Sequence, residues 1–254
     1  MSEKFDELVN IISRLRAPDG CKWDREQTHT SLKQNFIEET YEALDAIDAN
    51  DMKHLKEELG DVLLQVVLHA QIAKEEGAFD IDDVAQGISE KLVHRHPHVF
   101  GDVKVNSTQE ILDNWEKLKK EEKPHRTSIM DGISRSLPAL FAAYKISKKA
   151  IKVGFEWPNV ESLYDCFYSE IEEFKQAVKN DDKENMEEEI GDAFFALVNL
   201  ARWHKINPEI ALDKANKKFT KRFRKMEELA TKPLEEYSFE EYDKLWKEAK
   251  EELK

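Results

Sequence analysis

The chain has 254 residues, enough for one large domain or two of ordinary size, and 40% of them are hydrophobic, enough for a packed core. Its formal net charge of −14 argues against a general nucleic-acid or anionic-membrane binder, which would need a basic surface. No apolar run approaches the roughly twenty residues of a membrane span, so we expect a cytoplasmic protein without membrane contact or direct nucleic-acid binding.

The composition predicts an all-α fold. The chain has 8 Gly and 7 Pro, about half the usual share of each, and its long stretches of Glu, Lys, Leu and Ala place apolar residues three and four positions apart. The first predicted helix is residues 31–47, followed by a short polar turn at 48–54 and a second helix that contains EELGDVLLQVVLHAQ from residue 57. A third helix of mixed charge and a last helix with Trp115 and Lys119 complete this half.

The same order of elements returns in the second half of the chain, 131 residues later. Residues 160–178 form its first predicted helix, 179–185 its turn, and EEIGDAFFALVNLAR from residue 188 repeats the motif of the first half. The last helix begins with a predicted capping box of Ser238 and Glu241. A turn this short makes the first two helices of each half antiparallel neighbours.

The region between the halves, around Pro124, combines Pro, Gly and mixed charge without any periodicity. We therefore predict two tandem helical domains of the four-helix type, residues 1–124 and 125–254, related by internal duplication. Each unit has so few helices that apolar faces remain uncovered, and we expect a homodimer.

Each half also repeats a set of carboxylates with the pattern E-x-x-E followed by E-x-x-D. Acidic residues make up 53 of the 254 positions, so one such pattern could arise by chance, whereas two at one offset indicate common ancestry. Residues three apart lie on one face of a helix, so the four side chains of each half should converge. The two sets are Glu39, Glu42, Glu58 and Asp61 in the first half, and Glu170, Glu173, Glu189 and Asp192 in the second.

Such a cluster predicts a metal site. Four carboxylates in one place repel one another unless protons or divalent ions neutralise them, and all-oxygen ligands favour Mg²⁺ or Mn²⁺ over Zn²⁺. A di-iron bundle would need Glu-x-x-His on the facing helices, and the two instances here, which begin at Glu26 and Glu122, lie outside the acidic helices. Mg²⁺ held by few carboxylates keeps waters and substrate phosphates, so we expect a phosphorylated substrate.

Phosphate contacts must come from side chains, because no glycine of the chain precedes a lysine as a P-loop requires. Lys218 and Arg222 lie one helical turn apart and are well spaced for this, although the same spacing fits a solvated basic face. Trp246 and Lys250 also share a helix face, where the Trp either joins the core or stacks on a base.

Several long motifs, in this order, resemble the MazG family of nucleoside triphosphate pyrophosphohydrolases in its tandem two-domain form. The resemblance covers essentially the whole chain. It implies four-helix units that associate as dimers, and Mg²⁺-dependent hydrolysis of nucleoside triphosphates to monophosphate and pyrophosphate, by attack at the α phosphorus and with broad base tolerance. The motifs are RLRAPDGCKWDREQTHTSL from residue 14, IEETYEALDAI from 37, EELGDVLLQVVLHAQ from 57, HRHPHVFGDV from 94, KAIKVGFEWPN from 149 and EEIGDAFFALVNLAR from 188.

The resemblance places the family's metal ligands on both carboxylate sets and implies that Lys218, Arg222, Trp246 and Lys250 bind the nucleotide. In this reading the basic pair neutralises charge that develops during attack. Two positions depart from the family pattern. Ser169 stands where the first half has Glu38, and Lys22 replaces the usual Pro. The Ser leaves open whether Glu188 or a metal-bound hydroxide activates the water.

The residues favour the second half as the active one. Asn199 follows Asp192 on the same stripe and can offer a nucleotide both a donor and an acceptor, whereas the first half has Leu68 there. Lys218 and Arg222 correspond as a pair to Lys91 and Arg95 only if the offset falls from 131 to 127 residues. The carboxylates of the first half are then a second candidate metal site.

Two other functions remain open on the sequence alone. An enzyme of narrow specificity on the same scaffold, such as a dUTP or phosphoribosyl-ATP pyrophosphohydrolase, would carry the same ligands. A non-catalytic helical interaction module, whose acidic clusters merely bind ions, would carry them as well. Only turnover of triphosphates separates these readings.

Overall fold

The computed structural model describes residues 3–122 and 127–253. The chain divides into two units, residues 1–124 and 125–254. Throughout the described residues the regular secondary structure is helical and no strand is formed, which confirms the predicted all-α class. The predicted domain boundary at Pro124 lies outside the described residues and stays a prediction.

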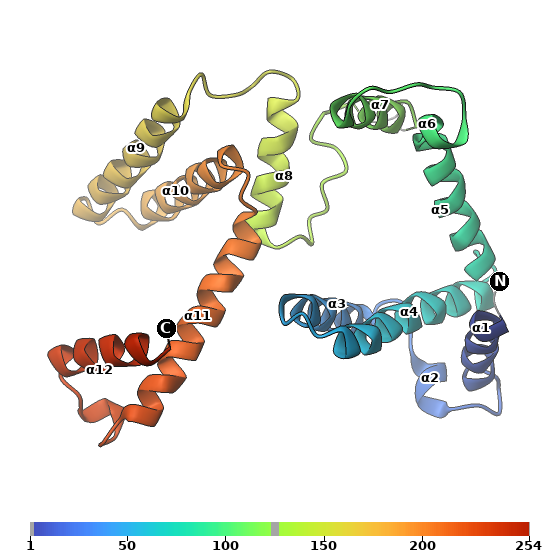
Figure 1. Ribbon diagram of the computed structural model, residues 1–254, viewed down its shortest axis with the longest axis horizontal. Helices are drawn as coiled ribbons and strands as arrows, with labels where there is room; N and C mark the ends of the chain where they lie inside the picture. Colours follow the sequence, from blue (N-terminus) through green and yellow to red (C-terminus); the bar gives the residue numbers. More distant parts are fainter. Residues whose placement is uncertain (1–2, 123–126, 254) are drawn as a thin grey trace. The chain divides into compact units, whose positions relative to one another are not determined.

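The helices of the two units follow one another as Figure 1 labels them. Those of the first unit are α1 (Glu3–Leu15), α2 (Lys22–Glu26), α3 (Lys33–Asp48), α4 (Met52–Glu75), α5 (Ile81–Arg95), α6 (Pro97–Phe100) and α7 (Thr108–Glu121). Those of the second unit are α8 (Ala139–Ile151), α9 (Val160–Lys179), α10 (Lys183–Trp203), α11 (Pro208–Leu229), the 3₁₀ helix η1 (Leu234–Glu236) and α12 (Phe239–Glu252).

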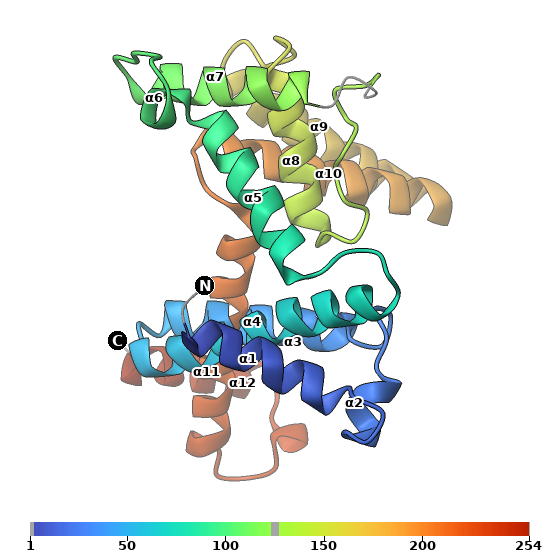
Figure 2. The ribbon, with the colours of Figure 1, turned by 90° about the vertical axis from the view of Figure 1, so that its right-hand side faces the viewer.

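Each unit is built around a helical hairpin, and the two hairpins are α3–α4 and α9–α10. Their helices lie side by side in Figure 1 and Figure 2. Both turns contain a residue with positive φ at matching positions, Asn50 and Asp181, each at 54°. The hairpins therefore confirm the repeat at the level of backbone conformation.

Both turns are shorter than the sequence predicted. Asp51 caps α4 by accepting hydrogen bonds from the backbone N–H groups of Lys53 and His54, each at 3.0 Å. Asp182 caps α10 in the same way, from the N–H of Asn185 at 3.1 Å. Because these caps satisfy the first free N–H groups, each helix begins inside the segment predicted as turn.

A further helix packs on each hairpin, and sequence reasoning missed both of them. In the first unit α1 packs on α4, where Ile12 joins a core with Leu32, Val67, Leu68 and Ile72. In the second unit α8 packs on α10 and α11. These helices fix the hairpins that carry the acidic motifs.

The second unit ends in a pair of packed helices, α11 and α12. Met226, Leu245 and Ala249 form their buried core. The predicted capping box is confirmed, because the Ser238 hydroxyl accepts from the Glu241 N–H at 3.3 Å while the Ser238 N–H donates to the Glu241 carboxylate at 2.8 Å.

Large apolar side chains of the second hairpin remain exposed. Tyr168 on α9 is 61% exposed, and Phe194 and Leu197 on α10 are 55% and 50% exposed. Large apolar side chains that gather on an exposed helical face are typical of an interaction site.

In the ranges 3–122 and 127–253, no helix is both long enough and apolar enough to span a membrane.

An ion pair between a buried arginine and a partly exposed glutamate of the second unit predicts a large stability effect. The Arg202 side chain is 7% exposed and donates to both carboxylate oxygens of Glu156, at 2.7 and 2.6 Å. We expect Glu156→Ala to lower the free energy of unfolding by about 3–5 kcal/mol, because it leaves a guanidinium buried without its carboxylate. Urea denaturation measures this loss.

The exposed pair of Lys4 and Glu7 is the matched control, and Glu7→Ala should cost less than about 1 kcal/mol. Burial raises the pKa of Glu156, but the hydrogen bonds from Arg202 and from the Trp157 backbone N–H, together with the Arg202 charge, outweigh burial and hold that pKa below its usual value. The contribution of the pair is then complete above the pKa of an unfolded Glu and is lost as the pH falls through the lower folded value. Equal losses in the two variants would contradict this account.

Candidate metal and nucleotide site

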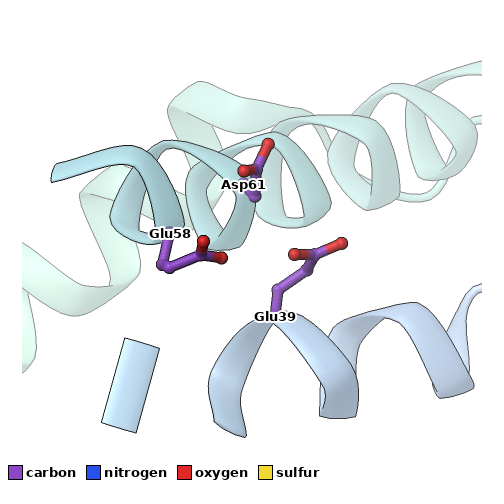
Figure 3. Close-up of side chains that lie close together, drawn as sticks. All are labelled: Glu39, Glu58 and Asp61. Carbon is purple, nitrogen blue, oxygen red and sulfur yellow. The ribbon is translucent and has the colours of Figure 1, made fainter. Parts of the chain in front are cut away.

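The structure gathers three of the four predicted carboxylates of the first unit. Glu39 from α3 and Glu58 and Asp61 from α4 each place an oxygen within 4.8 Å of the others. Figure 3 shows Glu39 and Glu58 directed into the space between the two helices, with Asp61 on the neighbouring turn of α4. Because the turn between the helices is short, the acidic motif of α3 lies beside the acidic motif of α4 in the hairpin.

Glu58 is the most buried member, with 5% of its surface exposed. His54, one turn earlier on α4, places its Nε2 2.8 Å from Glu58 Oε1. In the part of the chain that the structure describes, Glu58 Oε2 is buried and has no hydrogen-bond partner. Since an unpaired buried carboxylate oxygen is costly, this donor set fits a cation. The i, i+4 spacing of His54 and Glu58 is visible in the sequence, but sequence reasoning gave His54 no role.

Three carboxylates also meet in the second unit. Glu170 and Glu173 from α9 and Glu189 from α10 bring their oxygens within 4.8 Å of one another. Ser169, the residue that departs from the family pattern, donates a hydrogen bond from its hydroxyl to Glu173 Oε1 at 2.8 Å. The substitution thus replaces a charge with a donor that holds one of the clustered carboxylates.

Mutual repulsion shows in the pKa values of both clusters. Burial raises the pKa of Glu39, and the charges of Asp61, Glu42 and Glu58 raise it further. Burial likewise raises the pKa of Glu189, followed by the charges of Glu173 and Glu170. Each cluster therefore holds negative charge that a bound cation would stabilise.

One predicted carboxylate of each set stands outside its cluster, and it is a different one in each unit. Glu42 in the first unit and Asp192 in the second are exposed. Their charges still reach the clusters, because Glu42 raises the pKa of Glu39 and Asp192 raises that of Glu189. Three carboxylates per unit leave room for water and phosphate oxygens on a hexacoordinate ion.

Cys166 lies beside the second cluster, with its Sγ 3.6 Å from Glu170 Oε1. Burial and the Glu170 charge raise the pKa of this thiol, so it stays protonated and can donate weakly to the carboxylate. Sequence reasoning did not place it near the site, because only its i, i+4 spacing to Glu170 signals the contact.

The predicted nucleotide contacts lie on α11 and α12. The guanidinium carbon of Arg222 is 5.8 Å from the centroid of the Trp246 ring, and Phe219 contacts the same ring at a centroid distance of 5.1 Å. Trp246 also packs against the core of these two helices. Lys218 and Lys250 are exposed. In the described ranges no ion pair joins these cations to the three carboxylates of the unit.

Asn199 is engaged inside the second unit. The Ser147 hydroxyl on α8 donates to Asn199 Oδ1 at 2.6 Å, and Asn199 Nδ2 donates to the backbone oxygen of Phe195 at 2.9 Å. The side chain is buried and connects α8 to α10. Its structural role is clear from these contacts, and its contact with a nucleotide stays a prediction.

The acidic clusters are formed by carboxylates alone. None of the groups found in the described part of the chain contains a histidine. Glu26 ends α2, which belongs to neither hairpin, and His125, which would complete the second Glu-x-x-His pair, lies outside the described residues. All-oxygen ligation favours a hard divalent cation.

Comparison with known proteins connects this geometry to one family. The model of the MazG nucleotide pyrophosphohydrolase domain matches residues 27–100 and 159–227, the segments that contain both hairpins. The chain is 49% identical over 250 residues to the nucleoside triphosphate pyrophosphohydrolase/pyrophosphatase MazG of Thermotoga maritima, covering 97% of this chain and 95% of that protein. It is 46% identical over 257 residues to the nucleoside triphosphate pyrophosphohydrolase of Escherichia coli K12, with 97% of each covered.

A third relative is longer than this chain. The chain is 52% identical over 253 residues to the uncharacterized protein YabN of Bacillus subtilis, and the match covers 98% of this chain but 52% of that protein. This chain therefore corresponds to about half of that relative.

Proposed function

The chain belongs to the MazG nucleotide pyrophosphohydrolase family and is a nucleoside triphosphate pyrophosphohydrolase, and we propose that its reaction depends on Mg²⁺, accepts many bases and takes place at the second unit. The observation that carries this proposal is the cluster of Glu170, Glu173 and Glu189, with oxygens within 4.8 Å of one another. Family membership supports the reaction. The first unit has a similar cluster, so the choice of the second unit rests on Lys218 and Arg222 of α11 as phosphate contacts.

The three carboxylates would hold Mg²⁺, with Asp192 at the exposed edge of the group. Mg²⁺ bound there would supply charge neutralisation for the triphosphate and polarise its phosphoryl group. Ser169 holds Glu173 through its hydrogen bond, so this carboxylate is oriented before the substrate arrives. In the first unit Glu39, Glu58 and Asp61, with Glu42 nearby, form a second metal site.

The remaining residues act on the substrate and on the attacking water. Glu188 is exposed, and its charge raises the pKa of Glu189. We propose that Glu188 is the general base, which accepts a proton from the water that attacks the α phosphorus. Lys218 and Arg222 neutralise charge on the phosphates. The Trp246 face and Lys250 hold the nucleoside.

A second copy of the chain completes this proposal. Tyr168, Phe194 and Leu197 are exposed on the hairpin that carries the cluster, and burying such side chains between two copies stabilises a dimer.

A panel of natural and non-standard nucleoside triphosphates, assayed for monophosphate and pyrophosphate with Mg²⁺, tests the function. We expect monophosphate and pyrophosphate in equal amounts. The values of kcat/KM for several bases should differ by less than about tenfold, because a site that tolerates many bases distinguishes them by no more than one weak contact. A preference above about a hundredfold for one substrate, such as dUTP or phosphoribosyl-ATP, would replace broad by narrow specificity. Failure to turn over any triphosphate would favour a non-catalytic interaction module.

A further inference from the structure

Both units stack an arginine on a tryptophan at corresponding places. The guanidinium carbon of Arg95 on α5 lies 5.3 Å from the Trp115 ring on α7, and that of Arg222 on α11 lies 5.8 Å from the Trp246 ring on α12. The tryptophans are 131 residues apart and the arginines 127. The structure thus identifies Arg95 as the counterpart of Arg222.

The two arginines differ in their partners. Arg95 Nε donates to Glu122 Oε1 at 2.9 Å, and Arg95 Nη2 donates to Glu122 Oε2. The Arg95 side chain is 10% exposed in this bidentate pair. Arg222 has no carboxylate partner in the ranges 3–122 and 127–253. The residue 131 positions after Glu122 is Leu253.

Glu122 lies among the cations that correspond to the proposed phosphate contacts. The hydrogen bond from Arg95 lowers the pKa of Glu122 most, and the charges of His94 and Lys91 lower it further. Lys91 precedes Arg95 by one helical turn, as Lys218 precedes Arg222. Carboxylate and phosphate oxygens are alternative bidentate partners of the guanidinium fork.

We propose that Glu122 occupies the phosphate-binding position of the first unit, so that each chain binds a nucleoside triphosphate at its second unit only. The inference rests on the proposed function, because it takes Lys218 and Arg222 as phosphate contacts. Glu122 is part of the same unit and acts at a high effective concentration. A triphosphate must displace it and overcome repulsion from its charge.

The number of triphosphates bound per chain tests this inference. Isothermal titration of the full chain with α,β-methylene ATP and Mg²⁺ should give one site in the wild type and two in Glu122→Gln, which keeps the shape of the side chain and removes its charge. Adding Arg95→Ala to Glu122→Gln should restore one site. One site in both the wild type and Glu122→Gln would overturn the inference.

A second variant covers the case in which Glu122→Gln does not fold. Glu122→Ala removes the carboxylate together with the rest of the side chain, and it should also bind two molecules of α,β-methylene ATP per chain. The matched control is Glu121→Gln, at an exposed neighbour that ends α7, and it should bind one as the wild type does. A single site in Glu122→Ala would count against the inference.

The same titrations separate this inference from the proposed function. If the wild type binds no α,β-methylene ATP at all, the proposed nucleotide contacts are wrong and the inference fails with them. If the wild type binds two per chain, the proposed function stands and Glu122 does not exclude the nucleotide.

Discussion

Glu189→Gln should reduce pyrophosphate release by at least about a hundredfold, because a catalytic site that loses one group stabilising transition-state charge typically loses that much. Glu189 is the only member of its cluster that α10 contributes, and Glu170 and Glu173 both come from α9. The substitution keeps the size of the side chain but removes the charge that would bind a cation across the two helices.

The matched variant is Glu58→Gln, at the corresponding position of the first unit. We expect it to retain most of the activity, because Glu122 already occupies Arg95 in that unit. Circular dichroism should show both variants folded. If Glu58→Gln were the inactive variant, the first unit would be the active one, and equal partial losses would mean that both units are active.

Removal of divalent cations should abolish turnover and lower the melting temperature. Both clusters hold carboxylates with raised pKa values, and an ion that binds only the folded state stabilises it by mass action. Mg²⁺ or Mn²⁺ should restore both properties after treatment with EDTA, whereas Zn²⁺ should replace them poorly because it prefers nitrogen and sulfur ligands.

Two variants show where this stabilisation arises. Glu189→Gln should reduce the rise in melting temperature on adding Mg²⁺, and Glu187→Gln, an exposed residue of the same helix outside the cluster, should keep it. A chelator that left rate and melting temperature unchanged would show that the clusters are not metal sites.

The repeated acidic motifs predicted the hairpins because both motifs lie in long helices with strong apolar spacing. The same reasoning could have found α1, where Phe5, Leu8, Ile12 and Leu15 follow the three- and four-residue spacing of a helix. The turns were predicted too long because Asp51 and Asp182 were read as polar turn residues rather than as caps.

The candidate site was predicted only in part. Three-residue spacing places Glu39 and Glu42 on one face of α3, but it does not say which carboxylate points toward α4, and Glu42 stays outside the cluster. The pair of Arg95 and Glu122 joins residues 27 positions apart. Such a contact depends on how α5 meets α7, which no local pattern reveals.

Crystals of the protein with Mn²⁺ and α,β-methylene ATP test the central claim most directly. The anomalous signal of manganese should appear against Glu170, Glu173 and Glu189, with the triphosphate on the same ion. Manganese and triphosphate bound together at Glu39, Glu58 and Asp61, with none at the second cluster, would contradict it.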